Sequence, residues 1–141
     1  DEVFIATRQG FAIRFPAQRV PKTGCLGIRL EKNDAVVAAT AANDESSVFL
    51  LGADGKGTIR QMSGFAANKS PGGGGKVALK TDRLVAASAV ATDDDVFIIS
   101  RNSKIIRFQA AEVPPKEGVV QGVNCMALRG DETTAVAVAR L

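Results

Sequence analysis

Residues 3–15, with the sequence VFIATRQGFAIRF, contain the pattern that decides the fold. Two runs rich in apolar and β-branched side chains are separated by the short turn Arg8-Gln9-Gly10, which is typical of a β-hairpin. The same pattern starts again at Val48 and at Val96, after intervals of 45 and 48 residues. Repetition at such a period predicts an array of similar β-units.

Each hairpin is followed by the same kinds of segment. A long irregular stretch ends in a glycine, a third apolar run follows, and a polar turn leads to a fourth apolar run. The glycines are Gly27, Gly75 and Gly122, the third runs pass through Leu30, Leu79 and Leu128, and the fourth runs are residues 35–41, 84–90 and 134–139. The unit is therefore strand, turn, strand, long loop, strand, turn, strand.

A four-stranded unit of this length is the size of one blade of a propeller-like array, so an all-β fold is expected. The blades are predicted to span residues 1–47, 48–94 and 95–141. A β-sandwich is the alternative, but the matching order of features in the three repeats favours blades. Rings usually close with about four to eight blades. This chain is therefore expected to be part of a larger wheel, to associate with another copy, or to leave an open edge.

The composition argues against several classes of protein. The chain has no His, which leaves no Ser-His or Cys-His nucleophile pair and no imidazole metal site. Its two cysteines, Cys25 and Cys125, match no CxxC spacing, and two reduced, buried thiols are expected rather than one long-range disulfide. No apolar run is long enough to span a bilayer, and Asp1-Glu2 does not open a signal peptide. The formal net charge of +3 permits a polyanionic partner without requiring one.

Several matched segments carry a family resemblance. They are residues 11–15, 19–21 and 27–30 in the first repeat, 54–60 and 75–77 in the second, and 104–108, Val113, 122–123 and Leu128 in the third. These segments resemble blades of the C-terminal domain of DNA gyrase A, and the equivalent domain of topoisomerase IV has similar blades. The resemblance covers essentially the whole chain.

The resemblance implies a β-pinwheel, a propeller-like disc in which neighbouring blades exchange strands, and the repeats are most similar to the last three of six blades. It also implies a non-catalytic module that bends or wraps duplex DNA on a basic rim, without sequence preference, for a type IIA topoisomerase that supercoils DNA. Its catalytic residues would lie elsewhere. The implied partners are double-stranded DNA, the rest of the gyrase A-type subunit and the ATPase subunit, in the cytoplasm at the nucleoid. No cofactor, metal or membrane is implied, and self-association through the open edge is a further expectation.

DNA wrapping requires cations that meet phosphates at intervals along a curved face. Each third of the chain, divided at residues 47 and 94, has six Lys plus Arg. The candidates that recur are the arginines at the ends of the second strands and the lysines in the long loops, with two additions near the third runs. They are Arg14, Arg60 and Arg107, then Lys22, Lys69 and Lys116, then Arg29 and Lys76. The loop lysines are favoured, because long loops reach outward whereas strand-end arginines can pair with neighbouring acids.

The most diagnostic motif of the family is a basic, glycine-rich box, QRRGGKG. The nearest match is the stretch 71–77, in which only Gly74, Gly75 and Lys76 agree and both arginines are missing. The glycine run 72–75 lacks the strand–GxxxxGK[ST]–helix setting of a nucleotide site, so it predicts a loop that either approaches DNA or is disordered. The run Asp93-Asp94-Asp95 predicts a polar turn rather than a metal site.

A second function, from a different class, stays open at this point. The first third of the chain has a formal charge of zero and the box is eroded, which fits a protein-interaction scaffold with little affinity for DNA. The two functions differ in salt dependence, because binding through phosphate neutralisation weakens steeply as salt rises.

Overall fold

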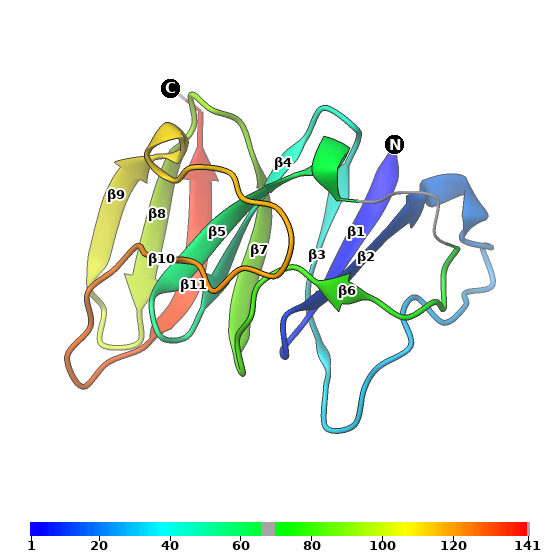
Figure 1. Cartoon of the computed structure of the whole chain (residues 1–141), viewed down its shortest axis with the longest axis horizontal. Helices are drawn as coiled ribbons and strands as arrows, with labels where there is room; N and C mark the ends of the chain where they lie inside the picture. Colours follow the sequence, from blue (N-terminus) through cyan, green and yellow to red (C-terminus); the bar gives the residue numbers. More distant parts are fainter. Residues whose placement is uncertain (66–69, 141) are drawn as a thin grey trace.

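The computed structural model describes residues 1–65 and 70–140, which form three antiparallel sheets (Figure 1). The first sheet has the order β3 (Val36–Ala42), β1 (Glu2–Thr7), β2 (Phe11–Pro16), β6 (Lys76–Val77). The second has the order β10 (Val123–Asn124), β5 (Lys56–Gln61), β4 (Ser47–Gly52), β7 (Leu84–Val90). The third has the order β11 (Thr133–Ala139), β8 (Asp95–Ser100), β9 (Ile105–Gln109). Short 3-10 turns, η1 (Ala17–Arg19), η2 (Met62–Gly64) and η3 (Ala110–Glu112), follow the second strand of each hairpin.

Neighbouring repeats exchange their outer strands, as expected for a β-pinwheel. β6 comes from the second repeat but pairs with β2, with Val77 opposite Phe11. β10 comes from the third repeat and pairs with β5, with Val123 opposite Gly57. In the second and third repeats the third strand is shorter than the sequence predicted. The run leaves its own sheet there and contributes only two residues to the sheet of the preceding repeat. The run at residues 27–30 is wrong as a strand, since it forms a single bridge between Arg29 and Gly74.

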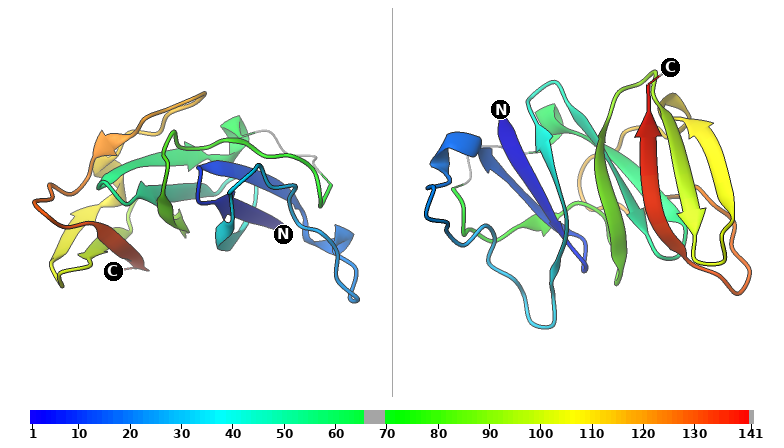
Figure 2. Two further views of the ribbon diagram at one scale, coloured as in Figure 1. Left: turned by 90° about the horizontal axis from the view of Figure 1, so that it is seen from below. Right: turned by 180° about the vertical axis from the view of Figure 1, so that it is seen from behind.

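The sheets stand side by side along an arc (Figure 2). The fourth strands lie on its inner side, where β3 lies beside β7 and β7 beside β11. These strands are rich in alanine, whose small side chain allows sheets to approach closely. The outer strands β2, β5 and β9 and the long loops therefore lie on the convex side, which is the rim of the array (Figures 1 and 2).

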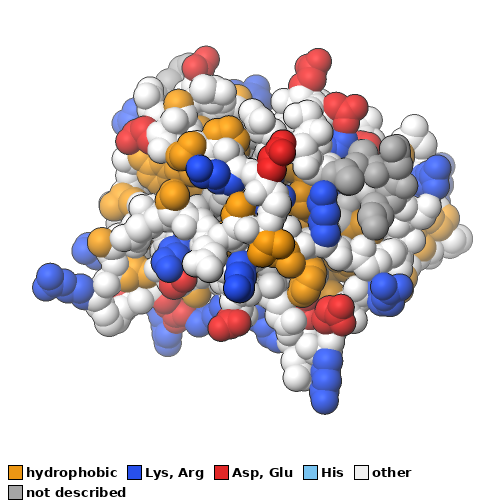
Figure 3. All heavy atoms as spheres, viewed as in Figure 1, with side chains coloured by type: hydrophobic (Ala, Val, Ile, Leu, Met, Phe, Trp, Pro, Cys, Tyr) orange, Lys and Arg blue, Asp and Glu red, His pale blue; other side chains and the backbone are white. Residues whose placement is uncertain are grey.

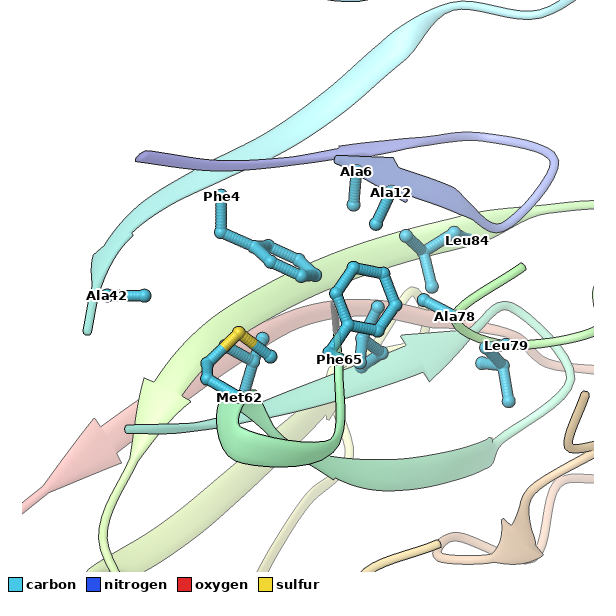
Figure 4. Packing of buried hydrophobic residues seen from close by; sticks show 11 residues of the cluster. Phe4, Ala6, Ala12, Ala42, Met62, Phe65, Ala78, Leu79 and Leu84 are labelled. Atoms are coloured by element: carbon cyan, nitrogen blue, oxygen red, sulfur yellow. The ribbon is translucent and has the colours of Figure 1, made fainter. Parts of the chain in front are cut away.

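The core lies between the sheets, so the first strands of the hairpins are apolar on both faces. One cluster joins the first two sheets, with Phe4 and Phe65 facing each other at 5.6 Å between ring centroids (Figure 4). A second cluster joins the second and third sheets, where the rings of Phe49 and Phe108 meet edge to face at 6.0 Å. In β4 alternate side chains pack into the two clusters, which explains why every residue from Val48 to Leu51 is apolar.

Both cysteines are free thiols, as expected, but the expectation that both are buried is wrong for Cys25. Cys25 is exposed, whereas burial raises the pKa of the Cys125 thiol to about 11. At pH 8 we therefore expect a maleimide to label Cys25 first, with Cys125 reacting about 10- to 100-fold more slowly, because the thiolate is the reactive form. The labelling rate of Cys125 should rise about tenfold per pH unit up to its pKa. Mass spectrometry of quenched samples, with urea-unfolded protein as control, measures this, and equal rates in the folded chain would contradict it.

Among residues 1–65 and 70–140 there is no helix with the length and apolarity that a membrane span requires.

Candidate nucleic-acid interface

Arg14 lies inside the structure, between the first two sheets. Its side chain is only 1% exposed. The guanidinium donates hydrogen bonds across the interface to the carbonyl oxygens of Met62 and Phe65, the latter at 3.3 Å, and to Asp44. Nε also lies 2.8 Å from the Glu2 carboxylate as an ion pair, without the angle of a hydrogen bond. A guanidinium held in this way faces protein carbonyls rather than a DNA backbone.

Arg60 does not occupy the position expected from the repeats. In the first and third hairpins the arginine lies directly opposite the phenylalanine of the first strand. In the second hairpin Ile59 lies opposite Phe49, and Arg60 lies opposite Val48. Because strand side chains alternate between faces, Arg60 points to the opposite face of its sheet from that expected. The prediction of three equivalent arginines is therefore wrong at this position.

Arg60 is also buried, and its bonds fasten the third repeat to the second. Its Nη1 donates to the carbonyl oxygens of Gly118, at 2.5 Å, and Ala78, at 3.3 Å. The guanidinium carbon lies 5.5 Å from the centre of the Phe65 ring. Burial lowers the pKa of this arginine, and the nearby Glu117 carboxylate partly offsets the effect. Two of the three strand-end arginines thus hold repeats together.

Arg107, the third strand-end arginine, is on the surface. It pairs with the carboxylate of Asp95, which accepts from Nε at 2.7 Å and lies 2.5 Å from Nη2. The guanidinium carbon is 5.8 Å from the centre of the Phe97 ring on the same face of the sheet. Pairing with a neighbouring acid was the alternative expected for these arginines.

Two of the three loop lysines, Lys22 and Lys116, are exposed. Lys22 is exposed in the turn that Gly24 closes by donating to the carbonyl oxygen of Pro21 at 2.9 Å. Lys116 is exposed too, and its backbone N–H donates to Ile59 at 3.1 Å, which fixes the loop against β5. Lys69 lies outside the described residues. The rim therefore has anchored loops that project cations outward.

The glycine run 72–75 packs against protein backbone. Gly72 donates to the carbonyl oxygen of Gly27, and Arg29 donates to that of Gly73, both at 2.9 Å. A Cβ atom at Gly74 would lie 2.7 Å from an Arg29 nitrogen, and one at Gly75 would lie 2.8 Å from the carbonyl oxygen of Ala12. The loop is thus ordered, and its glycines allow the first two repeats to approach closely.

Arg29 and Lys76, the two additional candidates, flank this loop and are both exposed. Arg29 lies against Gly74. The Lys76 ammonium lies 4.4 Å from the centre of the Phe65 ring. Both residues belong to the rim together with the loop lysines.

A second group of cations, which the sequence pattern did not predict, lies at the edge formed by the hairpin turns. The turns within the hairpins and the turns that enter β3, β7 and β11 meet there, as the bonds from Arg8 to Ala35 and from Arg101 to Glu132 show. We call this the hairpin edge. Its basic residues are Arg8, Lys32, Lys56, Lys80, Arg83, Arg101, Lys104 and Arg129, and its acidic residues are Glu31, Asp34, Asp54, Asp82, Asp131 and Glu132.

Several of these acids are held by turn bonds. Asp34 accepts from the backbone of Gln9 and Ala35, and Asp131 from that of Asn102 and Glu132. Burial alone would raise the pKa of Asp34, but the hydrogen bond with the Thr7 side chain, the two backbone bonds and the Arg8 charge together lower it. Glu132 is paired with Arg83 and Arg101. From the sequence alone, turn cations next to such acids cannot be distinguished from ordinary surface charges, so this group was not predicted.

The opposite edge, where one repeat connects to the next, is acidic. We define this connection edge as residues 1–2, 17–19, 43–46, 91–95, 109–112 and 140. It has eight Asp or Glu residues, and its only Lys or Arg residues are Arg19 and Arg140. In Figure 3 red side chains stand along the upper margin and blue side chains are prominent along the lower margin, although both colours occur in each half. A polyanion would be attracted to the rim and the hairpin edge and repelled by the connection edge.

The family model described as the DNA gyrase C-terminal domain, a beta-propeller, matches residues 1–43 and 94–117. The DNA gyrase A protein of Kosmotoga olearia is 30% identical over 145 residues, which cover 96% of this chain and 18% of that protein. The chain is thus similar to the DNA gyrase C-terminal domain family in its first and third repeats, and to gyrase A proteins over nearly its whole length. The gyrase A protein of Deinococcus deserti is 34% identical over 138 residues, covering 88% of the chain and 17% of that protein.

Solved structures show the same fold as this gyrase-type domain. A DNA topoisomerase IV C-terminal domain superposes with a TM-score of 0.91 at 16% identity, covering 99% of this chain and 47% of that one. A DNA gyrase A C-terminal domain superposes with a TM-score of 0.89 at 22% identity, covering 98% and 50%. The expected resemblance and all-β pinwheel fold are therefore confirmed. The gyrase-type chain spans less than a fifth of its curated relatives and about half of these solved domains.

Among the described residues, no group of three or more Cys, Asp or Glu side chains is arranged to hold a metal ion. The exposed charged groups proposed for the rim are the ammonium groups of its lysines and the guanidinium group of Arg29. Such groups bind phosphate oxygens through charge-assisted hydrogen bonds.

Proposed function

We propose that this chain binds duplex DNA through its phosphate backbone and bends it along the convex rim. The observation that carries the proposal is the division of charge in a gyrase-type pinwheel, with loop cations on the rim, turn cations on the hairpin edge and acids on the connection edge. Phosphate contacts supply affinity with little sequence information, so the binding would not depend on sequence. The proposed contacts on the rim are Lys22, Arg29, Lys76 and Lys116, and Lys69, which lies outside the described residues, stays a candidate from the sequence.

The buried arginines Arg14 and Arg60 are left out of this set, because their guanidinium groups are used between repeats. Cations of the hairpin edge, such as Lys56 and Lys104, are added, because both are exposed. The bend would follow the arc of the sheets, so contact with a longer duplex would engage more than one repeat (Figure 2).

In the cell, we propose that the module acts without catalysis of its own within a type IIA topoisomerase. It would present bent DNA to catalytic residues elsewhere in a gyrase A-type subunit, in support of the supercoiling that the ATPase subunit drives. That role would place it in the cytoplasm at the nucleoid.

Salt dependence tests the DNA contact directly. We expect the double variant Lys22→Gln/Lys116→Gln to weaken binding to random-sequence duplexes and to reduce the slope of log K against log salt by about 2, or about 1 for each lost phosphate contact. Fluorescence anisotropy at several salt concentrations, with short and long duplexes, measures both quantities.

Arg140→Gln is the matched control, because it removes an exposed charge from the connection edge. Its slope should equal that of the unchanged protein. If the loop variant also keeps the original slope, Lys22 and Lys116 are not phosphate contacts. Absence of any binding at low salt would favour the protein-interaction scaffold instead.

A further inference from the structure

The long loop of the third repeat is fastened to the second repeat on both sides of its lysine. The backbone N–H of Lys116 donates to the carbonyl oxygen of Ile59 at 3.1 Å, and Pro115 forms a β-bridge with the same residue. Two residues further on, the carbonyl oxygen of Gly118 accepts from Arg60 at 2.5 Å. The Lys116 side chain is exposed. The backbone is therefore held at this point while the ammonium group is left to the solvent.

The rest of the loop is seated on the second repeat as well. A Cβ atom at Gly64, in η2, would lie 2.3 Å from a carboxylate oxygen of Glu117, so this side chain lies directly against the turn. Where the loop returns, the carbonyl oxygen of Val120 accepts from the backbone N–H of Lys80 at 2.7 Å. Val120 also packs against the core cluster between the first two sheets. Contacts from three parts of the second repeat thus determine the course of the loop.

The register of the second hairpin explains why Arg60 can reach this loop. Arg60 lies on the face of its sheet that carries Phe65, and it also donates to the carbonyl oxygen of Ala78 at 3.3 Å. The loop crosses β5 to reach the same side (Figure 1). With the register of the first and third hairpins, the arginine would point to the other face of the sheet, away from Gly118. The change of register therefore converts a strand-end arginine into an anchor for the loop.

We propose that Arg60 is a positioning residue for the DNA contact of Lys116. The inference rests on the proposed function and deepens it. A loop that is ordered before binding loses less conformational freedom when it meets a phosphate, so more of the contact appears as affinity. Arg60 acts through the loop backbone and does not touch DNA, because it is only 3% exposed.

Hydrogen exchange without DNA tests the anchoring. Arg60→Lys keeps an ammonium group but cannot reproduce the reach and geometry of the guanidinium at Gly118. Exchange of the Lys116 amide should become about three- to tenfold faster, the effect of losing about one hydrogen bond. Arg14→Lys is the matched control, because Arg14 is similarly buried but donates to carbonyl groups outside this loop. Unchanged exchange at Lys116 in Arg60→Lys would overturn the proposal.

A cycle of double variants on duplex DNA tests the positioning. Lys116→Gln should reduce the slope of log K against log salt by about 1, and Arg60→Lys should reduce it toward the same value. Combining the two should cost no more than Lys116→Gln alone, because the contact is already lost. Combining Arg60→Lys with Lys22→Gln should give additive losses, since Lys22 lies in a different loop. General destabilisation would affect both combinations alike.

Two outcomes of this cycle have different meanings. Additive losses for Arg60→Lys and Lys116→Gln would overturn the positioning role while leaving the proposed function in place. Absence of binding by the unchanged chain at low salt would overturn the proposed function, and the inference with it.

Gly64→Ala perturbs the same loop and leaves Arg60 in place. Gly64 is not among the glycines with positive φ, so the backbone accepts alanine, but the added Cβ displaces the Glu117 side chain. The same lack of additivity with Lys116→Gln is expected, with a smaller single effect. If Arg60→Lys does not fold, this variant decides. An unchanged salt slope, or losses that add to those of Lys116→Gln, would then overturn the proposal.

Discussion

Replacing Gly10 with Ala is expected to lower the free energy of unfolding by about 3 kcal/mol or more. Gly10 has φ of +88°, and an added Cβ would lie 1.9 Å from the carbonyl oxygen of Leu79. The backbone at this turn cannot shift without losing hydrogen bonds, because the Gly10 carbonyl accepts from the backbone N–H groups of Ala78 at 2.8 Å and Leu79 at 3.3 Å. The substitution would thus separate the exchanged strand β6 from the first sheet. Urea unfolding monitored by circular dichroism measures the change.

Gly24→Ala provides the matched control. Gly24 has nearly the same backbone conformation, with φ of +91°, but an added Cβ would have no atom within 4 Å apart from its chain neighbours. Only the conformational cost of about 1 kcal/mol should remain there. Equal losses at the two glycines would show that the close approach of Leu79 to the hairpin turn does not contribute to stability.

Much of the fold could be predicted because local pattern and tertiary packing agree. The hairpins are visible as paired apolar runs around short turns, and the predicted fourth runs agree within one residue with β3, β7 and β11. The third runs could not be predicted as well, because their partners belong to the preceding repeat. Their length is set by how far the chain crosses to β2 or β5, which local propensity does not encode.

The candidate site was predictable only where position alone determines exposure. Lys22 and Lys116 are on the surface because they lie in long loops. The burial of Arg14 and Arg60 depends on carbonyl groups about fifty residues away, which no local pattern reveals.

One signal for Arg60 was nevertheless available in the sequence. The hairpin arginines follow their phenylalanines by ten residues in the first and third repeats and by eleven in the second. A change of one residue in a hairpin moves a side chain to the other face of the sheet. The interval thus predicts that Arg60 does not point toward the third sheet as Arg14 points toward the second.

Replacing Arg14 with Met is expected to lower the free energy of unfolding by about 3 to 5 kcal/mol, the usual cost of breaking a buried ion pair from one side. Methionine fills part of the space but leaves the carbonyl oxygens of Met62 and Phe65 without this donor and removes the cation from Glu2. An unsatisfied buried acceptor and an uncompensated carboxylate are both costly. Urea unfolding of the single variant gives the value.

Arg140→Met is the control, since that side chain is 89% exposed and its loss should change stability by less than about 0.5 kcal/mol. The double variant Arg14→Met/Glu2→Gln separates the two causes. It should recover part of the loss, because the glutamine removes the uncompensated charge while the carbonyl oxygens stay unsatisfied. A loss below about 1 kcal/mol for Arg14→Met, within the range of a surface pair, would mean that Arg14 does not hold the first two sheets together.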